Sequence, residues 1–304
     1  MASGALAVTG ATGFVGSAVL DYALDQGHVC RALTRRPQTE RKGAEWVQGT
    51  LSDTAALEQL VEGSDAVIHI AGLTNTPNPA EFETANVAGT AAVIATAKAA
   101  KVKRFVFVSS LSAREPQLSA YGASKAKAET LVQESGLDWT IVRPPAVYGP
   151  RDDDMFELFR SAQYGLVPLP PKGATSIIHV DDLARLLIVL AGKSALKTIY
   201  EPDDGQVGGY SHKDLGKAIG RAVGRRSVLA VNLPGDVLKL AAKGDKLLRG
   251  DKAKLTADRV GYMLHPNWVA RFDRAVPSDI WEPQITGDAG LKATAEWYDQ
   301  EGWF

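Results

Sequence analysis

A glycine-rich turn near the start of the chain, set between a short apolar strand and a helix, constrains the fold most strongly. Leu6–Thr9 is apolar enough for a buried strand, and Phe14–Gln26 has the pattern of a helix. Glycines between them allow a tight turn and a close approach of backbone to a ligand. The helix start also presents free N–H groups and a positive dipole end, which favour a phosphate. The turn predicts dinucleotide binding; the alternative is a glycine-rich turn without a ligand.

The same alternation of short apolar runs and amphipathic stretches continues for about half of the chain. Strands rich in Val, Ile and Phe that alternate with helices predict a parallel sheet covered on both faces. We therefore expect a Rossmann-type, doubly wound α/β fold. The expected strands are Leu6–Thr9, Val29–Leu33, Ala66–Ile70, Phe105–Ser109 and Trp139–Val142, and the expected helices are Phe14–Gln26, Thr54–Val61, Ala85–Ala100 and Ala123–Glu134.

The sequence pattern changes after Pro144-Pro145, where proline and glycine cluster and the regular alternation of strands and helices ends. A strand-then-helix unit returns at Ile177–Leu190, and later helices are expected at His212–Val223, Pro234–Lys243 and Leu291–Gln300. We expect residues 1–150 and about 174–200 to form the dinucleotide-binding domain. A smaller, mostly helical substrate lobe is expected from residues 151–173 and 201–304.

Composition and charge argue against several classes of protein. The 304 residues carry a formal net charge of -1, so no global field attracts nucleic acid or an anionic membrane. The single cysteine, Cys30, cannot form an internal disulfide, which fits a reducing compartment. The first residues lack the basic segment of a signal peptide, and no apolar run approaches the roughly 20 residues of a membrane span. These features predict a cytoplasmic protein that binds a small-molecule substrate and no nucleic acid.

The end of the second expected strand bears on the choice of cofactor. NAD-binding folds usually place a carboxylate there to bind the ribose 2′-hydroxyl. This chain reads Leu33-Thr34-Arg35-Arg36 instead, with two guanidinium groups and no acid. A 2′-phosphate would pair well with Arg35, helped by Arg36 or Thr34. The alternative is that both arginines belong to a solvated loop, but because the acid is absent as well, we favour NADP over NAD.

Three residue types suited to proton transfer follow the strand at Phe105–Ser109. Tyr121 and Lys125 stand four residues apart and thus on one face of a helix, where the ammonium can stabilise a tyrosinate. Ser110, at the carboxyl end of a strand, can hold a substrate hydroxyl or carbonyl. A tyrosine and lysine at this spacing also occur by chance on solvated helices, but the order of the three residues after a glycine-rich turn favours catalysis.

With these motifs the chain resembles the extended short-chain dehydrogenase/reductase family, also described as NAD-dependent epimerase/dehydratase proteins. The resemblance extends to about Leu190 and is only general beyond about Val207. It rests on Thr9–Gly16, Asp65–Gly72, Asn86–Thr90, Ser109-Ser110, Tyr121–Lys125, Arg143–Pro150 and His179–Ala184.

The resemblance implies roles for particular residues. Tyr121 would be the catalytic acid/base, Lys125 its partner that also binds the nicotinamide ribose, and Ser110 the group that positions the reacting oxygen. Expected cofactor contacts come from Gly10, Thr12, Gly13, Phe14, Val15, Gly16, Thr34, Arg35, Arg36, Leu51, Ala71, Gly72, Tyr121, Lys125, Pro144 and Val147. Expected substrate contacts come from Leu73, Ser110, Ser112, Tyr148, Met155 and Phe159, of which Met155 and Phe159 could equally be core residues.

Two departures from the family pattern affect the expected ligands. Thr50 stands where many members have an Asp that touches adenine, and Thr175 stands near the place of an Arg that meets a substrate diphosphate. Because a diphosphate needs countercharge, the missing Arg favours a ketone, aldehyde or secondary alcohol with an apolar body. The leading hypothesis is therefore a hydride-transferring oxidoreductase. The alternatives are a nucleotide-sugar epimerase or dehydratase with internal redox, and a non-catalytic dinucleotide-binding sensor or accessory protein.

Other charged and polar residues predict simpler roles. The histidines show no metal-ligand spacing, and Asp152-Asp153-Asp154 is more simply helix N-terminal charge than a cation site, so no metal is expected. A basic stretch could meet a membrane surface or an acidic partner, but such stretches are usually solvated faces; it contains Lys239, Lys243, Lys246, Arg249, Lys252 and Lys254. A homodimer through helices near Glu83–Ala100 and Tyr121–Glu134 is possible by resemblance.

Overall fold

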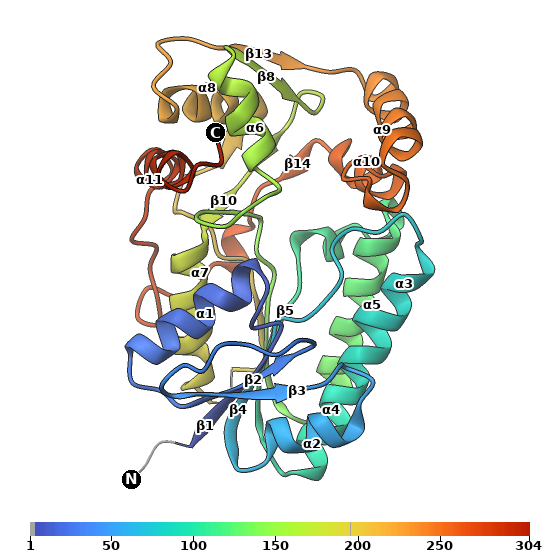
Figure 1. The fold of residues 1–304 in the computed structure, drawn as a ribbon, viewed down its shortest axis with the longest axis vertical. Helices are drawn as coiled ribbons and strands as arrows, with labels where there is room; N and C mark the ends of the chain where they lie inside the picture. The colour runs from blue at the N-terminus through green and yellow to red at the C-terminus, as the bar shows by residue number, and fades with distance from the viewer. Residues whose placement is uncertain (1–3, 195) are drawn as a thin grey trace. The chain divides into compact units, whose positions relative to one another are not determined.

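The computed structural model describes residues 4–194 and 196–304, which divide into two compact units (Figure 1). The first unit contains the described residues up to Arg143, together with Leu183–Tyr200. The second contains Pro144–Asp182 and Glu201–Phe304. The chain thus leaves the first unit once, returns for a helix and a strand, and leaves again.

A seven-stranded sheet organises the first unit, and all of its strands are parallel. The spatial order is β11-β6-β5-β4-β1-β2-β3, so the chain reverses direction across the sheet between β1 and β4. Ligands of doubly wound sheets bind at such a switch point, beyond the carboxyl ends of the strands. The strands are β1 (Ala5–Thr9), β2 (Cys30–Thr34), β3 (Ala44–Gln48), β4 (Ser64–His69), β5 (Arg104–Val108), β6 (Asp138–Val142) and β11 (Thr198–Tyr200).

Helices cover this sheet, as Figure 1 shows for α1, α4, α5 and α7. One apolar core contains residues of the strands together with side chains of α2, α4 and α5, such as Leu60, Val93 and Val132. The helices are α1 (Phe14–Asp25), α2 (Thr54–Val61), α3 (Ala80–Phe82), α4 (Gly89–Ala99), α5 (Ala120–Glu134) and α7 (Val180–Ala191); a π-helix (Glu83–Ala88) joins α3 to α4, and 3-10 turns (Leu111–Arg114 and Pro116–Leu118) precede α5.

The second unit has no large sheet among its described residues. Its strands form three small groups: β7 (Ala146–Tyr148) with β10 (Ile177–His179), β8 (Leu166–Leu169) with β13 (Leu229–Asn232), and β9 (Ala174–Thr175) between β12 (Tyr210–Ser211) and β14 (Asn267–Trp268). Its helices are α6 (Phe156–Gln163), α8 (His212–Ala222), α9 (Gly235–Arg249), α10 (Ala257–Met263) and α11 (Gly287–Gln300). A second apolar core, with Phe159, Ile177, Leu291 and Tyr298, lies among these elements.

The Rossmann-type fold is confirmed, but the observed elements differ from the expected ones in places. Strand β10 and helix α7 form the strand-then-helix unit expected at Ile177–Leu190, whereas β3, β11 and the other strands of the second unit were not expected. The expected helix Ala85–Ala100 begins at Ala80 and passes through the π-helix, while the expected Pro234–Lys243 continues to Arg249. Residues 144–150 and 174–182 lie in the second unit, because β7 and β10 pair with each other and not with the central sheet. The α-helices are longer than the strands throughout the described part of the second unit, as expected.

Candidate active site

The glycine-rich turn after β1 has no space for side chains at two of its glycines. Gly10 adopts a φ of +74°, and a Cβ added there would lie 2.7 Å from the Ala71 nitrogen. A Cβ at Gly16 would lie 2.0 Å from the carbonyl oxygen of Gly10. Helix α1 begins directly afterwards, and its N-cap, Gly13, provides no side-chain cap. The first amides of α1 are therefore available to a phosphate.

The end of β2 presents two cations. Arg35 and Arg36 are exposed, and no acid pairs with either within the described residues. The buried hydroxyl of Thr34 donates to the Arg36 carbonyl oxygen at 2.6 Å and accepts from the Arg36 nitrogen at 3.2 Å. Thr34 therefore shapes the turn, while the guanidinium groups remain free for a ligand. Another expected cofactor residue, Leu51, packs against Gly89, where a Cβ would lie 2.7 Å from its Cδ1.

The turn that carries Ser110 packs directly on the start of α5. A Cβ added at Gly122 would lie 2.7 Å from the carbonyl oxygen of Ser112, so only glycine permits this approach. The Ser110 and Ser112 hydroxyls are 2.9 Å apart, and the Ser119 hydroxyl accepts from the Gly122 nitrogen at 2.9 Å. Tyr121, in the same first turn of α5, is 9% exposed. The structure thus brings the serine turn and the tyrosine turn together.

Lys125 lies buried beneath this turn. Its Nζ donates to the Val108 carbonyl oxygen at 2.7 Å and lies 4.7 Å from the centroid of the Phe107 ring. Nζ is also 3.6 Å from the position that a Cβ at Gly72 would take, so the ammonium lies next to the segment that follows β4. Burial lowers the pKa of Lys125 to about 8, and the nearby Glu129 carboxylate opposes that shift. The lysine is thus held at the carboxyl edge of β4 and β5, near the switch point.

Asn86 connects the segment after β4 to α5. Its Oδ1 accepts from the Leu73 nitrogen at 2.7 Å, and its Nδ2 donates to the Leu73 carbonyl oxygen at 3.0 Å and to the Ser124 hydroxyl at 2.9 Å. The Ser124 hydroxyl in turn donates to the Tyr121 carbonyl oxygen at 2.7 Å. Asn86 lies in the π-helix, whose extra residue per turn changes the direction of its side chain relative to α4. Leu73, an expected substrate residue, is thereby held by backbone contacts to Asn86.

His69, at the end of β4, is a site residue that sequence reasoning missed. The Thr9 hydroxyl accepts from the nitrogens of Ile70 and Ala71, both at 3.1 Å, so it uses its hydrogen toward Nδ1 of His69 at 2.7 Å. Nε2 of His69 then carries the ring proton and donates to the Thr90 hydroxyl at 3.0 Å. Burial, with a smaller effect of Lys125, lowers the pKa of His69 to about 3, so the ring is neutral.

The hydrogen bonds of His69 link the glycine-rich turn to the helix that bears Asn86. The Thr90 hydroxyl donates to the Asn86 carbonyl oxygen at 2.6 Å, which completes a path from β1 through β4 to the π-helix. The signal in the sequence was a polar residue within the apolar run Ala66–Ile70, where a strand was expected. Such a residue is buried only when its hydrogen bonds are satisfied.

A buried ion pair holds α5 against the ends of β5 and β6. The Glu129 carboxylate accepts from Nε and Nη2 of Arg143, at 2.9 and 2.6 Å, and from the Ser109 hydroxyl. Glu129 is only 3% exposed. The two parallel hydrogen bonds restrict the rotation of α5, and with it the position of Tyr121 and Lys125.

Several expected ligand contacts lie in the second unit. Tyr148, Met155 and Phe159 pack into its apolar core, and the Tyr148 ring lies 5.2 Å from that of His179. Tyr148 and Phe159 are both 0% exposed, so the structure places them as core residues. Pro144 and Val147 belong to the same unit, and their contacts to a cofactor stay predictions.

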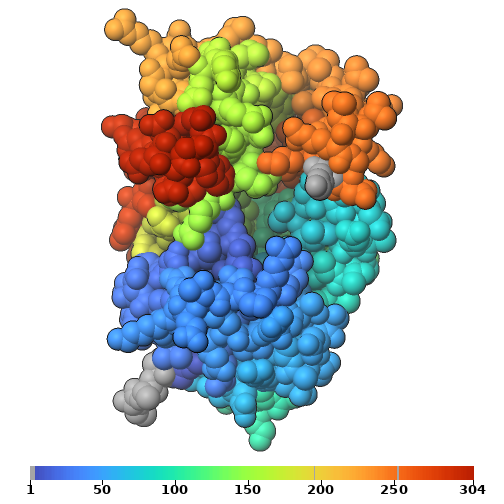
Figure 2. Space-filling view, in the orientation of Figure 1, coloured from blue at the N-terminus to red at the C-terminus, as the bar shows by residue number. Residues whose placement is uncertain are grey.

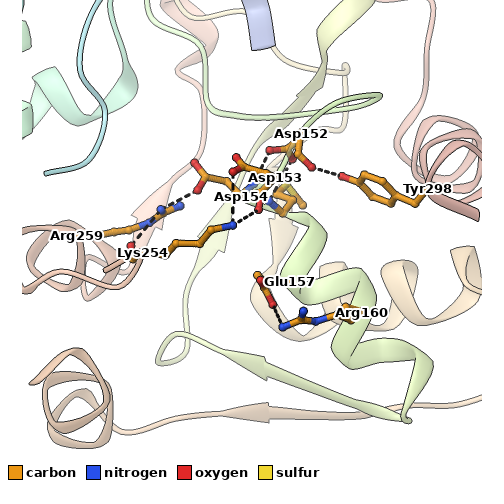
Figure 3. Close-up of polar contacts among 9 residues, drawn as sticks. Asp152, Asp153, Asp154, Glu157, Arg160, Lys254, Arg259 and Tyr298 are labelled. Carbon is orange, nitrogen blue, oxygen red and sulfur yellow. Dashed lines mark hydrogen bonds and ion pairs between the residues drawn. The ribbon is translucent and has the colours of Figure 1, made fainter. Parts of the chain in front are cut away.

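The three consecutive aspartates have structural partners (Figure 3). The Asp152 carboxylate accepts from the nitrogens of Asp154 and Met155, at 2.9 and 3.2 Å, just before α6. Asp153 pairs with Lys254 at 3.5 Å, and Asp154 pairs with Arg259 at 2.8 Å. Across residues 4–194 and 196–304, no group of three or more His, Cys, Asp or Glu side chains is arranged to hold a metal ion.

Comparison with known proteins gives one family and several relatives. A family model described as NAD(P)H-binding matches residues 10–190. The chain is 33% identical to a ceramide reductase of Caulobacter vibrioides, over 99% of this chain and 96% of that protein. It is 30% identical to 4-hydroxy-2-methyl-3-oxo-4-farnesyl-3,4-dihydroquinoline-1-oxide ketoreductase of Stigmatella aurantiaca, over 65% of this chain and 67% of that protein.

Solved structures share the fold. The UDP-glucose 4-epimerase of Thermus thermophilus, in complex with NAD, matches with a TM-score of 0.70 and 20% identity. The match covers 97% of this chain and 99% of that one.

Proposed function

Since the chain belongs to the extended short-chain dehydrogenase/reductase family, we propose that it is an NADPH-dependent reductase of a carbonyl compound with a large apolar body. The observation that carries this proposal is the packing of α5. Gly122 packs against the Ser110–Ser112 turn, and the Nζ of Lys125 is buried beside Gly72, so the residues proposed for proton transfer lie at the carboxyl edge of β4 and β5. A structural role for the fold would not require a buried lysine at that edge.

The residues around the glycine-rich turn suit a dinucleotide. A bound nicotinamide cofactor would supply or accept the hydride. The turn with its close-packed Gly10 and Gly16 and the uncapped start of α1 would hold the pyrophosphate, and Gly72 would leave room above Lys125. Lys125 would hold the nicotinamide ribose.

In the proposed reduction, the Tyr121 hydroxyl donates a proton to the oxygen of the substrate carbonyl. Ser110 orients that oxygen through its own hydroxyl. Lys125 stabilises the tyrosinate that remains, because its positive charge lies on the same face of α5. Asn86 and His69 hold α5 and the glycine-rich turn in fixed positions relative to the segment after β4, through the hydrogen bonds described above. The direction of proton transfer reverses for oxidation of a secondary alcohol.

The substrate class is proposed from the relatives and from one departure in the sequence. A ceramide reductase is 33% identical over nearly the whole chain, and a ketoreductase for a farnesylated quinoline is 30% identical over 65% of it. Both names describe carbonyl or alcohol groups on lipophilic molecules. In addition, Thr175 stands where a diphosphate-binding Arg is expected in nucleotide-sugar enzymes, and its hydroxyl donates to the Ser176 carbonyl oxygen. A lipophilic ketone therefore fits better than a nucleotide sugar.

Replacement of Tyr121 by Phe tests the catalytic assignment. Because general acid catalysis contributes about 10²- to 10⁴-fold, we expect Tyr121→Phe to lower kcat/KM for a lipophilic 3-oxo substrate about a thousandfold, with NADPH binding retained. The matched control is Tyr164→Phe, since Tyr164 is 84% exposed. Activity toward UDP-glucose in place of ketones would favour the epimerase. Unchanged activity in Tyr121→Phe would contradict the assigned chemistry.

Binding titrations test the choice of NADP over NAD. We expect NADPH to bind more tightly than NADH, and Arg35→Ala to weaken NADPH about tenfold while leaving NADH unchanged, because only NADPH offers the 2′-phosphate. Fluorescence titration measures both constants, with the exposed Lys42→Ala as a control for net charge. Tighter binding of NADH than of NADPH, unchanged in Arg35→Ala, would contradict the assignment. It would favour an NAD-dependent enzyme or an accessory role instead.

A further inference from the structure

Helix α9 has apolar residues on two opposite faces, and the protein covers only one of them. On the inner face, Leu238 and Ala242 pack with Val260 of α10 in a small core. On the outer face, Leu240 is 70% exposed, Leu247 87% and Leu248 86%. Single exposed leucines are normal on protein surfaces, but three large ones on one helix of 15 residues form a patch.

The exposed residues form a continuous stripe. Positions 237, 240, 241, 244, 247 and 248 repeat at intervals of three and four residues, and each bears an apolar residue. Gly244 lies in the middle of the stripe, and a Cβ there would meet nothing within 4 Å. Val237 and Ala241 are exposed as well. At a rise of about 1.5 Å per residue the stripe is roughly 16 Å long.

Lysines run along one edge of this stripe. Lys239, Lys243 and Lys246 repeat at the same helical spacing, and all three are exposed. Lys239 lies 3.4 Å from Asp236, but Lys243 and Lys246 have no acid partner in the described chain. The acids are few: Asp245 pairs with Arg249 at 3.3 Å, and it also accepts from the Leu255 nitrogen at 2.8 Å. The exposed side of α9 is therefore apolar and basic, although the whole chain has a net charge of -1.

We propose that α9 is an interfacial helix that binds the surface of an anionic lipid bilayer. Leucines on one face and lysines beside them are the pattern of helices that lie in the plane of a membrane surface. The leucines would enter the boundary between headgroups and acyl chains, and the lysines would meet lipid phosphates. Figure 2 shows α9, in orange at the upper right, as part of the molecular surface. Among the described helices none is long and apolar enough to cross a membrane, so α9 would lie on the bilayer.

Charge distinguishes this partner from a second copy of the chain. Two copies of α9 that met antiparallel across a two-fold axis would place the lysine edge of one helix against the lysine edge of the other. Like charges in that position oppose the contact, whereas lipid phosphates neutralise them. The inference goes beyond the proposed function and does not depend on it, since neither Tyr121 nor Lys125 takes part.

Sedimentation of the full-length protein with lipid vesicles tests the proposal. The probes are vesicles of phosphatidylcholine alone and of phosphatidylcholine with about one third phosphatidylglycerol. We expect the protein to bind the mixed vesicles, because each Lys near an anionic surface contributes about 1 kcal/mol, or about fivefold in binding. Binding should fall at high salt, because salt screens the attraction between lysines and lipid phosphates. The double variant Lys243→Glu/Lys246→Glu and the double variant Leu247→Ser/Leu248→Ser should each lose at least tenfold in binding.

The controls separate loss of the surface from loss of the fold. Phe272→Ser removes an exposed apolar side chain, 95% exposed, outside α9, and Lys98→Glu reverses an exposed charge in the first unit; both should bind vesicles like the unmodified protein. Circular dichroism and NADPH binding should be unchanged in every variant. Absence of binding to the mixed vesicles, equal binding by the α9 variants, or a concentration-dependent dimer that Leu247→Ser/Leu248→Ser abolishes would each overturn the proposal. An inactive enzyme that still binds vesicles would overturn only the proposed function.

Discussion

The two units use buried polar side chains for different purposes. In the first unit, backbone ladders of the seven-stranded sheet hold the fold together, and polar side chains gather at its carboxyl edge. In the second, the strands are short, and polar side chains from distant parts of the chain join the loops. The Asp182 carboxylate accepts from the nitrogens of Gln284 and Ile285, and the Tyr298 hydroxyl donates to the Asp152 carbonyl oxygen (Figure 3).

The difference shows what a regular sheet makes possible. The strand ladders satisfy the backbone hydrogen bonds of the first unit and stabilise its fold. The unit can therefore tolerate a buried charged side chain such as Lys125, although that burial lowers the free energy of unfolding. The described part of the second unit has only short ladders, such as that of β8 with β13, and several of its buried polar groups satisfy the backbone of loops instead. Some buried polar groups of the first unit also have structural roles: the Glu129–Arg143 ion pair fixes α5, and Asn86 and Thr9 satisfy backbone groups after β4. The comparison predicts opposite effects on stability when Lys125 is replaced in the first unit and when Asp182 or Tyr298 is replaced in the second.

The largest effect is expected in the second unit at Asp182. Asp182→Ala removes the buried carboxylate that accepts two charge-assisted hydrogen bonds from the Gln284 and Ile285 nitrogens, which should lower the free energy of unfolding by about 4 kcal/mol. Urea unfolding followed by circular dichroism measures this loss. Asp181→Ala is the matched control, because the Asp181 side chain is 62% exposed, and it should change stability little. Equal losses of stability in Asp182→Ala and Asp181→Ala would contradict the proposed role of buried polar groups in the second unit.

A smaller effect of opposite sign is expected at Lys125 in the cofactor-free protein. Its folded pKa, about 8, is below the usual 10.5, so between pH 8 and 10.5 the unfolded chain binds more protons, and stability rises with pH in that window. Below pH 8 the buried charge costs about 3 kcal/mol. Lys125→Met should thus be more stable than the unmodified protein at pH 7, with the advantage shrinking toward pH 10.

Urea unfolding at several pH values checks this convergence of the two stability curves. The control is Lys127→Met on the same helix, since the Lys127 side chain is 59% exposed and pairs with Glu83 at the surface. Its stability curve should stay parallel to that of the unmodified protein. Parallel curves for Lys125→Met as well would show that the lysine is not destabilising, and the contrast between the units would then fail.

The smallest effect is expected at Tyr298, which sharpens the comparison within the second unit. Tyr298→Phe keeps the fully buried ring but removes the 2.6 Å hydrogen bond to the Asp152 carbonyl oxygen. Loss of one neutral hydrogen bond should lower the thermal midpoint by a few degrees, equivalent to about 1 kcal/mol. Calorimetry measures the shift against Tyr164→Phe, which should leave the midpoint unchanged. An unaltered midpoint for Tyr298→Phe would mean that the hydroxyl does not join α11 to the loop before α6.

The sequence alone determined the parts of this protein whose physical cause is local. Apolar runs predicted five strands of the central sheet to within two residues, because continuous Val, Ile and Phe are compatible only with burial on both faces. The glycines at 10 and 16 were predicted from the turn that they permit, and the structure shows that no Cβ fits at either. The spacing of Tyr121 and Lys125 on one helical face also followed from helix geometry.

Only the tertiary structure decided the parts that depend on distant partners. Strand β11 was not expected, since a run as short as Thr198–Tyr200 becomes a strand only by pairing with β6. The role of His69 required Thr9 and Thr90 on either side of its ring, and the core position of Tyr148 required β10 and α11 around it. Nothing near these residues in the sequence records such contacts, because packing and buried hydrogen bonds join positions that the chain itself keeps far apart.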